Sequence, residues 1–264
     1  MNVHHPESDR RCWVVFRFWD LSRVWSFVLG LLLIVPCADA ANAKLKVLVV
    51  TGGHGFETNQ FFRVFAENPD ITFINVIQSR TSSTAYDRDD LLSYDCIVLY
   101  DMVQNITEAQ KAKFLSLFDK GVGLVVTHHA LVSYQNWPEF ERIMGGTYPD
   151  PQDKKGKVTA ELGYEHDVDV PVVIVAKDHP VMAGVNNFTI NDEIYWGFRT
   201  TRDVTPLITT THAKSGKPLA WYRTEKNSRV VYLQLGHGPR AYNDPNYRKL
   251  LAQSIRWTAR GAEK

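Results

Sequence analysis

The sequence predicts an α/β fold with a mostly parallel central sheet and antiparallel additions in its second half. Two observations lead to this prediction. In the first half, short apolar runs alternate with helical patterns across short connections, which indicates βαβ units with right-handed crossovers. In the second half, strand-like runs follow one another with few helices between them, as in mixed sheets that carry antiparallel strands at one edge.

The first half contains four expected strands and three expected helices. Residues 46–51 (KVLVVT) form a continuous apolar run, which is typical of a strand buried on both faces. Thr107 and Gln110 form a capping box at the start of the second helix, and Gly121 can supply its left-handed stop. The remaining strands are expected at residues 71–77, 97–100 and 123–127, and the helices at 58–66, 107–120 and 137–144.

The second half is expected to add four strands and a closing helix. The strand-like runs are residues 170–176, 204–210, 219–223 and 230–235, and residues 247–258 form an amphipathic helical pattern. No internal repeat and no low-complexity linker divides the sequence. We therefore expect residues 41–264 to form a single α/β domain.

Residues 1–40 have the pattern of a signal peptide. The apolar run at residues 25–36 follows four arginines, and Ala38-Asp39-Ala40 fits the A-x-A cleavage pattern. The run is shorter than the roughly 20 residues that a membrane span needs. The expectation is an exported protein, periplasmic or secreted, and the alternative is an uncleaved N-terminal membrane anchor.

Composition narrows the classes of partner. The 264 residues include 44% hydrophobic and 22% charged residues, with a net charge of +1, which is an ordinary globular balance. This balance gives no electrostatic footprint for nucleic acid and favours a small, near-neutral ligand. Of three cysteines only Cys96 lies beyond the presequence, so an internal disulfide is not expected. The sequence also leaves a homo-oligomer possible.

Histidines follow three of the expected strands. His54 lies in GGHG after the first strand, His128 and His129 in THHA after the fourth, and His237 in LGHG after the last. Ligands of open parallel sheets bind at the carboxyl ends of the strands, so these histidines should converge there. Histidine at this position indicates acid–base chemistry or metal ligation.

Two further segments carry candidate binding residues. Glu193 lies beside Tyr195 and Trp196, a carboxylate with two aromatics, as sugar sites often require. His166 lies in a short segment dense in ionisable groups, Tyr164-Glu165-His166-Asp167. The sequence contains no G-x-G-x-x-G, no Walker A motif and no G-x-S-x-G elbow, which disfavours dinucleotide and nucleotide binding and serine hydrolysis.

Six motifs in order resemble the ThuA-like, or trehalose utilisation, family. They lie between residues 44 and 261 and are GVGLVVTHHA from Gly121, Gly145-Gly146, His179-Pro180, DEIY from Asp192, PLAW from Pro218 and RVVYLQLGH from Arg229. The resemblance implies a flavodoxin-like three-layer sandwich, similar to class I glutamine amidotransferases but without their catalytic cysteine.

The resemblance also implies a link to disaccharides, particularly oxidised (keto) sugars. His128, His237 and Glu193 match family motifs, whereas His129 occupies a position where the family usually has a small residue. We therefore expect a carbohydrate-processing enzyme, a hydrolase, lyase or isomerase, in which histidines and Glu193 act as acid and base. A non-catalytic sugar-binding module and a structural domain are the alternatives.

The candidate residues divide into two groups. The expected catalytic residues are His128, Glu193, His237 and His54. The expected substrate-binding residues are Tyr195, Trp196, His166 and His129. The sequence leaves open whether the protein binds a divalent metal such as zinc. The ligands of such a metal would come from His54, His128, His166 and His237.

Overall fold

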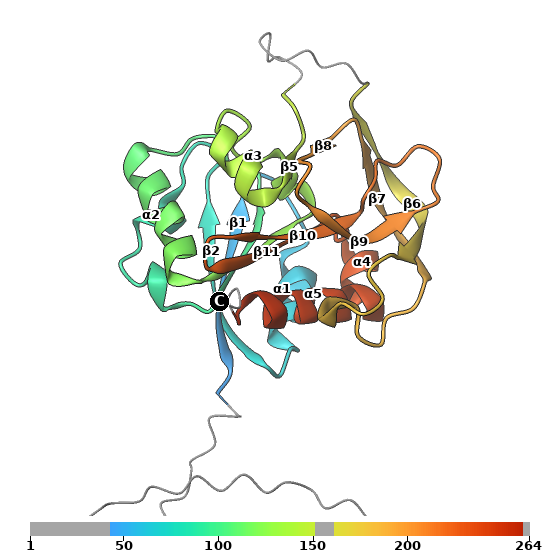
Figure 1. Ribbon diagram of the computed structural model, residues 1–264, viewed down its shortest axis with the longest axis horizontal. Helices are drawn as coiled ribbons and strands as arrows, with labels where there is room; N and C mark the ends of the chain where they lie inside the picture. The colour runs from blue at the N-terminus through green and yellow to red at the C-terminus, as the bar shows by residue number, and fades with distance from the viewer. Residues whose placement is uncertain (1–42, 151–160, 261–264) are drawn as a thin grey trace, which may run out of the picture. The chain divides into compact units, whose positions relative to one another are not determined.

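A sheet of nine strands, in the order β2-β1-β3-β4-β11-β10-β9-β6-β7, forms the middle of the fold (Figure 1). The computed structural model describes residues 43–150 and 161–260. Strands β2, β1, β3, β4 and β11 are parallel neighbours, and β10, β9, β6 and β7 join them in antiparallel pairs. The strands are β1 Leu45–Gly52, β2 Ile71–Gln78, β3 Cys96–Asp101, β4 Gly123–Thr127, β6 Gly163–Ile174, β7 Phe188–Trp196, β9 Thr205–Thr210, β10 Ala220–Glu225 and β11 Ser228–Leu233.

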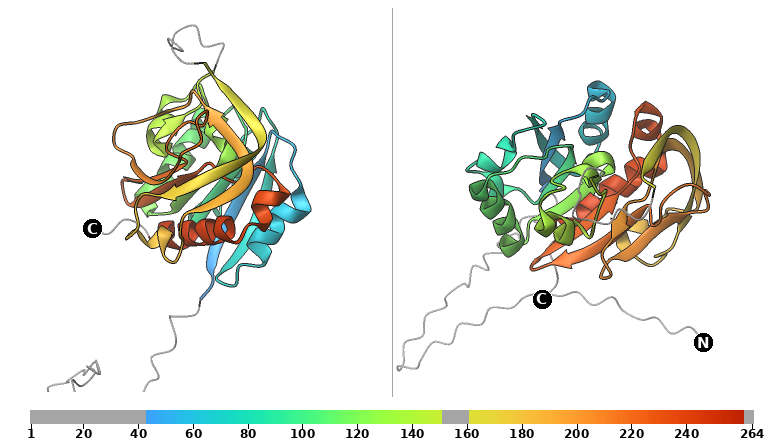
Figure 2. Two further views of the ribbon diagram at one scale, coloured as in Figure 1. Left: turned by 90° about the vertical axis from the view of Figure 1, so that its right-hand side faces the viewer. Right: turned by 90° about the horizontal axis from the view of Figure 1, so that it is seen from above.

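Helices cover both faces of this sheet (Figure 2). Alternate residues of β1 point to opposite faces, so Val47 and Val49 join one core, and Leu48 and Val50 join the other. The first core packs against α1 Thr58–Ala66, α4 Pro239–Asn243 and α5 Pro245–Thr258. The second packs against α2 Glu108–Lys120 and α3 Pro138–Met144. The prediction of a mostly parallel three-layer α/β fold is therefore confirmed.

Short elements complete the description. Strands β5 Gly146–Thr147 and β8 Arg199–Thr200 form a separate antiparallel pair. The 3₁₀ turns are η2 Thr84–Asp87, η3 Leu91–Ser93, η4 His128–Val132 and η5 Pro180–Met182.

Local signals place the helix ends as predicted. The Thr107 hydroxyl accepts a hydrogen bond from the Gln110 N–H, and the Gln110 side chain accepts one from the Thr107 N–H. Gly121 has a φ of 83°, which is the left-handed stop expected after α2.

The second half departs from the prediction in the hairpin of β6 and β7. The expected strand at residues 170–176 begins already at Gly163, and β7 was not expected as a strand. A bulge at residues 166 and 167 interrupts the pairing of β6 with β7, and Asp167 there has a φ of 56°. The strand signal failed because residues 163–169 are largely polar and lie in an exposed arm of the hairpin.

The hairpin of β6 and β7, in yellow to orange in Figure 2, is strongly curved. Its edge strand β7 meets the loop that follows the parallel strand β11. It is the last strand of the sheet, yet Asp192 in β7 accepts hydrogen bonds from the backbone N–H groups of Gly236 and His237, which follow β11. This curvature brings β7 over the end of β4 and β11, where the predicted histidines lie.

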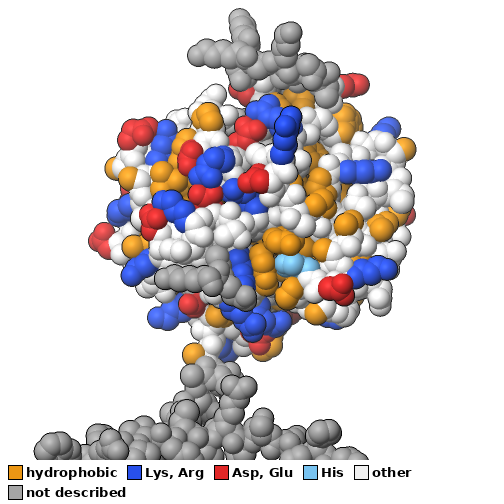
Figure 3. Space-filling model, viewed as in Figure 1, with side chains coloured by type: hydrophobic (Ala, Val, Ile, Leu, Met, Phe, Trp, Pro, Cys, Tyr) orange, Lys and Arg blue, Asp and Glu red, His pale blue; other side chains and the backbone are white. Residues whose placement is uncertain are grey.

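On the face shown in Figure 3, basic and acidic side chains are interspersed, in keeping with the small net charge. None of the helices in the described ranges is both long and apolar enough to cross a membrane. The predicted signal peptide at residues 1–40 lies outside the described residues.

Candidate functional site

His128 occupies a strained turn at the end of β4. Its φ of 50° is uncommon for a residue with a side chain, and such strain is often found at functional sites. The ring is fully buried, and its Nδ1 lies 2.8 Å from the carbonyl oxygen of Gln234. Because a carbonyl oxygen only accepts, Nδ1 carries the proton and donates it. The second ring nitrogen, Nε2, therefore faces the site.

Glu193 lies at the centre of the site. Its Oε2 is 2.9 Å from His128 Nε2, 3.1 Å from His237 Nδ1 and 2.7 Å from the Tyr195 hydroxyl, which donates to it. His128 Nε2 and His237 Nδ1 are themselves 3.2 Å apart. We call these four residues the Glu193 cluster. Glu193 and Tyr195 reach the same pocket because they are two positions apart on β7.

The second oxygen of Glu193 points to the bulged strand β6. Its Oε1 lies 3.2 Å from His166 Nδ1, whose side chain is 48% exposed. Side chains along a strand point alternately to its two faces, and the bulge after Glu165 shifts this alternation. The bulge therefore fixes which residue of β6 meets the carboxylate.

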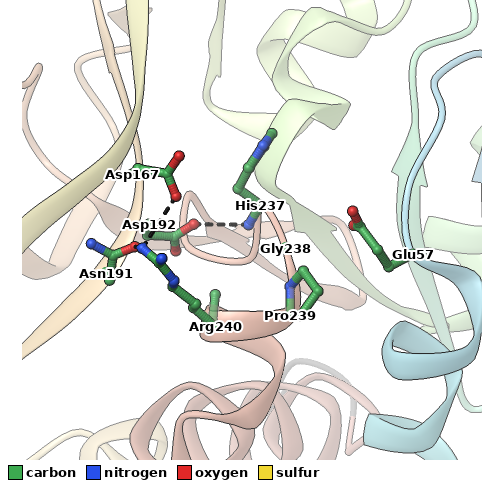
Figure 4. A pocket seen from close by; sticks show the side chains of 9 residues that line it. Glu57, Asp167, Asn191, Asp192, His237, Gly238, Pro239 and Arg240 are labelled. Carbon is green, nitrogen blue, oxygen red and sulfur yellow. Dashed lines mark hydrogen bonds and ion pairs between the residues drawn. The ribbon is translucent and has the colours of Figure 1, made fainter.

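Asp192 positions two members of the cluster. It is buried, and its Oδ1 accepts from the N–H of Glu193 at 2.9 Å and of His237 at 2.8 Å. Its Oδ2 accepts from the Gly236 N–H at 2.8 Å. One carboxylate thus ties β7 to the loop after β11 and fixes the backbone of both Glu193 and His237. Figure 4 shows its contact with His237.

The environment shifts the pKa values of Glu193 and His237 in opposite directions. Burial alone would raise the pKa of Glu193, but its close contacts with His128 and His237 outweigh burial and hold that pKa well below its ordinary value. The hydrogen bond to Glu193 raises the pKa of His237 against the opposing effect of burial. Burial, helped by the neighbouring His128, lowers the pKa of His129 well below its ordinary value, so His129 is neutral at pH 7.

A cavity of about 590 Å³ opens beside the cluster. This volume lies within the roughly 300–1,000 Å³ of small-molecule sites. Its wall includes every member of the cluster together with His54, His129 and His166. The rings of His54 and His129 are 4.9 Å apart, and those of His129 and His128 are 5.3 Å apart. Tyr148 and Tyr164 also line the cavity.

A second cavity of about 360 Å³ adjoins the first across His237 (Figure 4). Its lining is polar and includes Glu57 and Arg240. The Arg240 guanidinium donates to the side-chain oxygen of Asn191 at 2.7 Å and pairs with Asp167 at 3.3 Å. His237 is therefore accessible from two sides.

The structure brings together most of the predicted site residues. His54, His128, His129, His166, Glu193, Tyr195 and His237 share the larger cavity. Trp196 does not line it: it follows Tyr195 on β7, faces the other side of the strand and packs against the first core and Gly163. Sequence reasoning missed the positioning role of Asp192, because two of its three partners, Gly236 and His237, lie more than 40 residues away and bind it only through their backbone N–H groups.

Three side chains of the cluster could hold a metal ion. One donor atom each from His128, Glu193 and His237 lies within 4.8 Å of the others, and no other such group of three occurs within residues 43–150 and 161–260. The set differs from the four histidines considered from sequence, since Glu193 takes part and His54 and His166 do not.

Comparisons with known proteins agree with this description. The family model described as "ThuA: Trehalose utilisation" matches residues 46–258. No curated protein sequence matched. A ThuA-like protein from Parabacteroides merdae ATCC 43184 has a TM-score of 0.70 at 20% identity, covering 84% of this chain and 93% of that one.

Two further solved structures share the fold. A ThuA-like protein from Bacteroides uniformis ATCC 8492 has a TM-score of 0.57 at 21% identity, covering 84% of this chain and 94% of the other. PurLQS from Thermotoga maritima has a TM-score of 0.51 at 13% identity, covering 81% and 99%.

Proposed function

Because the chain belongs to the ThuA, or trehalose utilisation, family, we propose that it is an exported enzyme that acts on a disaccharide or keto-sugar at the Glu193 cluster. The family indicates a role related to carbohydrate. The observation that carries the proposal is the contact of one buried carboxylate oxygen with His128, Tyr195 and His237 at the wall of a cavity of ligand size. Clusters of coupled ionisable groups in a cavity mark functional sites.

The cluster supports chemistry next to a ketone. A base removes the proton from the carbon beside the carbonyl, and the electron pair of that C–H bond forms a C=C bond while the π pair of the C=O bond moves onto the oxygen, which gives an enolate. His54 borders the cavity and suits the base, while His237, which also lines the cavity and meets Glu193 through Nδ1, suits the donor of a hydrogen bond to the developing oxyanion. Elimination or isomerisation can follow from this intermediate.

Polar and aromatic groups suit the binding of sugar hydroxyls and ring faces. His129 is neutral, so its ring can accept a hydrogen bond from a hydroxyl, and its Nε2 has no partner within the described residues. His166 and the half-exposed Tyr164 stand at the rim. A sugar that binds here without turnover would identify the alternative, a sugar-binding domain.

Turnover and binding of disaccharides and their keto forms test the proposal. Wild-type protein should convert at least one of them, followed by NMR, and His237→Ala should slow it by roughly 10²-fold or more. Glu165→Gln is the matched control, since Glu165 is an exposed carboxylate on β6 that pairs with Lys214. Binding without conversion would replace the enzyme with the binding module, and the absence of both would refute the carbohydrate role.

Export is a separate part of the proposal and has its own test. The apolar run and the A-x-A pattern at residues 38–40 support it. N-terminal sequencing of protein from its natural host should begin near Ala41 or Lys44. A cytoplasmic protein that starts at Met1 would contradict export and leave the chemistry of the cluster untouched.

A further inference from the structure

We infer that His128, Glu193 and His237 form a binding site for one divalent transition-metal ion. Zinc is the ion with which this site is best tested. The inference deepens the proposed function by naming the electrophile of the same site. It concerns metal binding, which can be measured without any sugar.

The count of protons in the cluster is the first argument. His128 Nδ1 donates to the Gln234 carbonyl, so the neutral ring presents a lone pair at Nε2. That lone pair lies 2.9 Å from Oε2 of the Glu193 carboxylate, which is also an acceptor. Two acceptors in contact within a buried site repel each other unless a positive charge lies between them.

The Tyr195 hydroxyl cannot relieve this repulsion by itself. Its hydroxyl lies 2.9 Å from His128 Nε2 and 2.7 Å from Glu193 Oε2, but it carries one proton and can donate to only one of them. His237 Nδ1 is a third atom in the same contact. Either extra protons on the two imidazoles or one cation must balance the group.

The spacing of the donors fits a cation. The three donor atoms form a triangle with sides of 2.9, 3.1 and 3.2 Å. Ligands about 2.1 Å from a metal are about 3.0 Å apart at right angles and about 3.4 Å apart in a tetrahedron. Two sides of the observed triangle fall between these limits, and the third, at 2.9 Å, lies just below the lower one. A metal therefore fits on one side of the triangle with a small movement of the side chains.

The groups around the triangle are those that commonly support a metal ligand. Metal-binding histidines usually donate their other ring N–H to a carbonyl or carboxylate, as His128 does to Gln234. Ligating carboxylates are in turn hydrogen-bonded, as Glu193 is by Tyr195. Asp192 fixes the backbone of two of the three ligands, so the site is formed before a metal arrives.

The chemistry of the donor set selects the class of metal. Imidazole nitrogens favour zinc and its neighbours over magnesium and calcium, which prefer oxygen ligands. Two histidines and one carboxylate leave positions open for substrate, as catalytic zinc sites do. All three ligands line the larger cavity, so a ketone or hydroxyl oxygen bound there could reach the ion.

Zinc titration of chelator-treated, dialysed protein tests the inference, with isothermal calorimetry for stoichiometry and Co²⁺ absorption for the ligand set. Wild type should bind one zinc, and an excess of magnesium should not compete. Glu193→Gln and His237→Ala should each weaken binding by at least about 100-fold. His54→Ala should keep the wild-type zinc affinity, because His54 shares the cavity but not the triangle.

Each outcome decides one question. Failure of wild type to bind zinc, or binding that survives both Glu193→Gln and His237→Ala in folded protein, would overturn the inference in favour of a proton-balanced cluster. Sugar turnover by metal-free protein would overturn the role of the ion as electrophile while preserving the proposed function. Zinc binding with the predicted losses, but without turnover or sugar binding, would leave the metal site and refute the proposed function.

Discussion

Asp192→Asn is the substitution that most sharply tests how the site is held together. Asp192 accepts three backbone hydrogen bonds through two oxygens. Asparagine keeps one oxygen for Glu193 and His237, but its NH₂ group then faces the N–H of Gly236, donor against donor. Glu193 and His237 lose part of their shared anchor as a result.

The magnitude follows from these contacts. Loss of a hydrogen bond to a charged group costs about 1.5–3 kcal/mol, and the buried N–H that remains unpaired adds to this. Burial raises the pKa of Asp192, so removing the charge offsets a part of the loss. We expect a net destabilisation of about 2 kcal/mol, which corresponds to a fall in Tm of about 4–8 °C for a domain of this size.

Thermal and urea unfolding measure this change, with Asp169→Asn as the matched control. Asp169 is an exposed carboxylate on the neighbouring strand β6, paired with the Asn191 side chain, so its loss should cost less than about 0.5 kcal/mol. Turnover by Asp192→Asn should also fall, by about 10-fold or more, because both cluster residues shift. Equal stability and turnover for the two variants would refute the positioning role.

Three further predictions concern the scaffold. Burial raises the pKa of Asp101 to about 7. Between about pH 4 and pH 7 the native state therefore holds a proton that the unfolded state has lost. The free energy of unfolding should fall by about 4 kcal/mol in total as pH rises through this range. Urea unfolding of Asp101→Asn across this range should lack that decline, and an unchanged decline would contradict it. Burial raises the pKa of Cys96 to about 12, so alkylation of its thiol should be slow in the folded protein. Cys96→Ser should retain turnover. A folded but inactive Cys96→Ser variant would indicate that the thiol acts as a nucleophile. Gly52→Ala should prevent stable folding, because a Cβ there would lie 1.9 Å from the Gln78 carbonyl oxygen. Gly55→Ala should be tolerated, because the space around Gly55 is open. Equal stability of the two variants by circular dichroism would contradict this argument.

Sequence patterns were sufficient for the parallel half of the fold. Residues 46–51 are apolar because β1 is buried on both faces, and the capping box of α2 is a local signal that needs no tertiary partner. The strand-end position of His128 and His237 followed from the same patterns, because the carboxyl ends of parallel strands share one edge.

The β6–β7 hairpin could not be predicted in the same way. Two adjacent acids, Asp192 and Glu193, are unusual in a strand, and they are buried only because backbone N–H groups after β11 and the ring of His128 meet them there. The bulge that aims His166 at Glu193 likewise depends on the pairing with β7. These contacts are long-range, so no local pattern announces them.

Two features of the site also guide the choice of variants. His128 is fully buried and hydrogen-bonded to Gln234, so His128→Ala would remove support as well as chemistry. Glu193→Gln preserves the shape of the side chain and the hydrogen bond that Tyr195 donates. Changes in its activity therefore report on the carboxylate charge.

The rate of conversion of a keto-disaccharide by Glu193→Gln, compared with wild type by NMR in the same buffer and after confirmation that both are folded, tests the central claim most directly. If the Glu193 cluster is the reaction centre, wild type converts the sugar and Glu193→Gln is slower by at least about 100-fold. Conversion at the wild-type rate by folded Glu193→Gln would contradict the account, since no reaction at this centre could tolerate the loss of that charge.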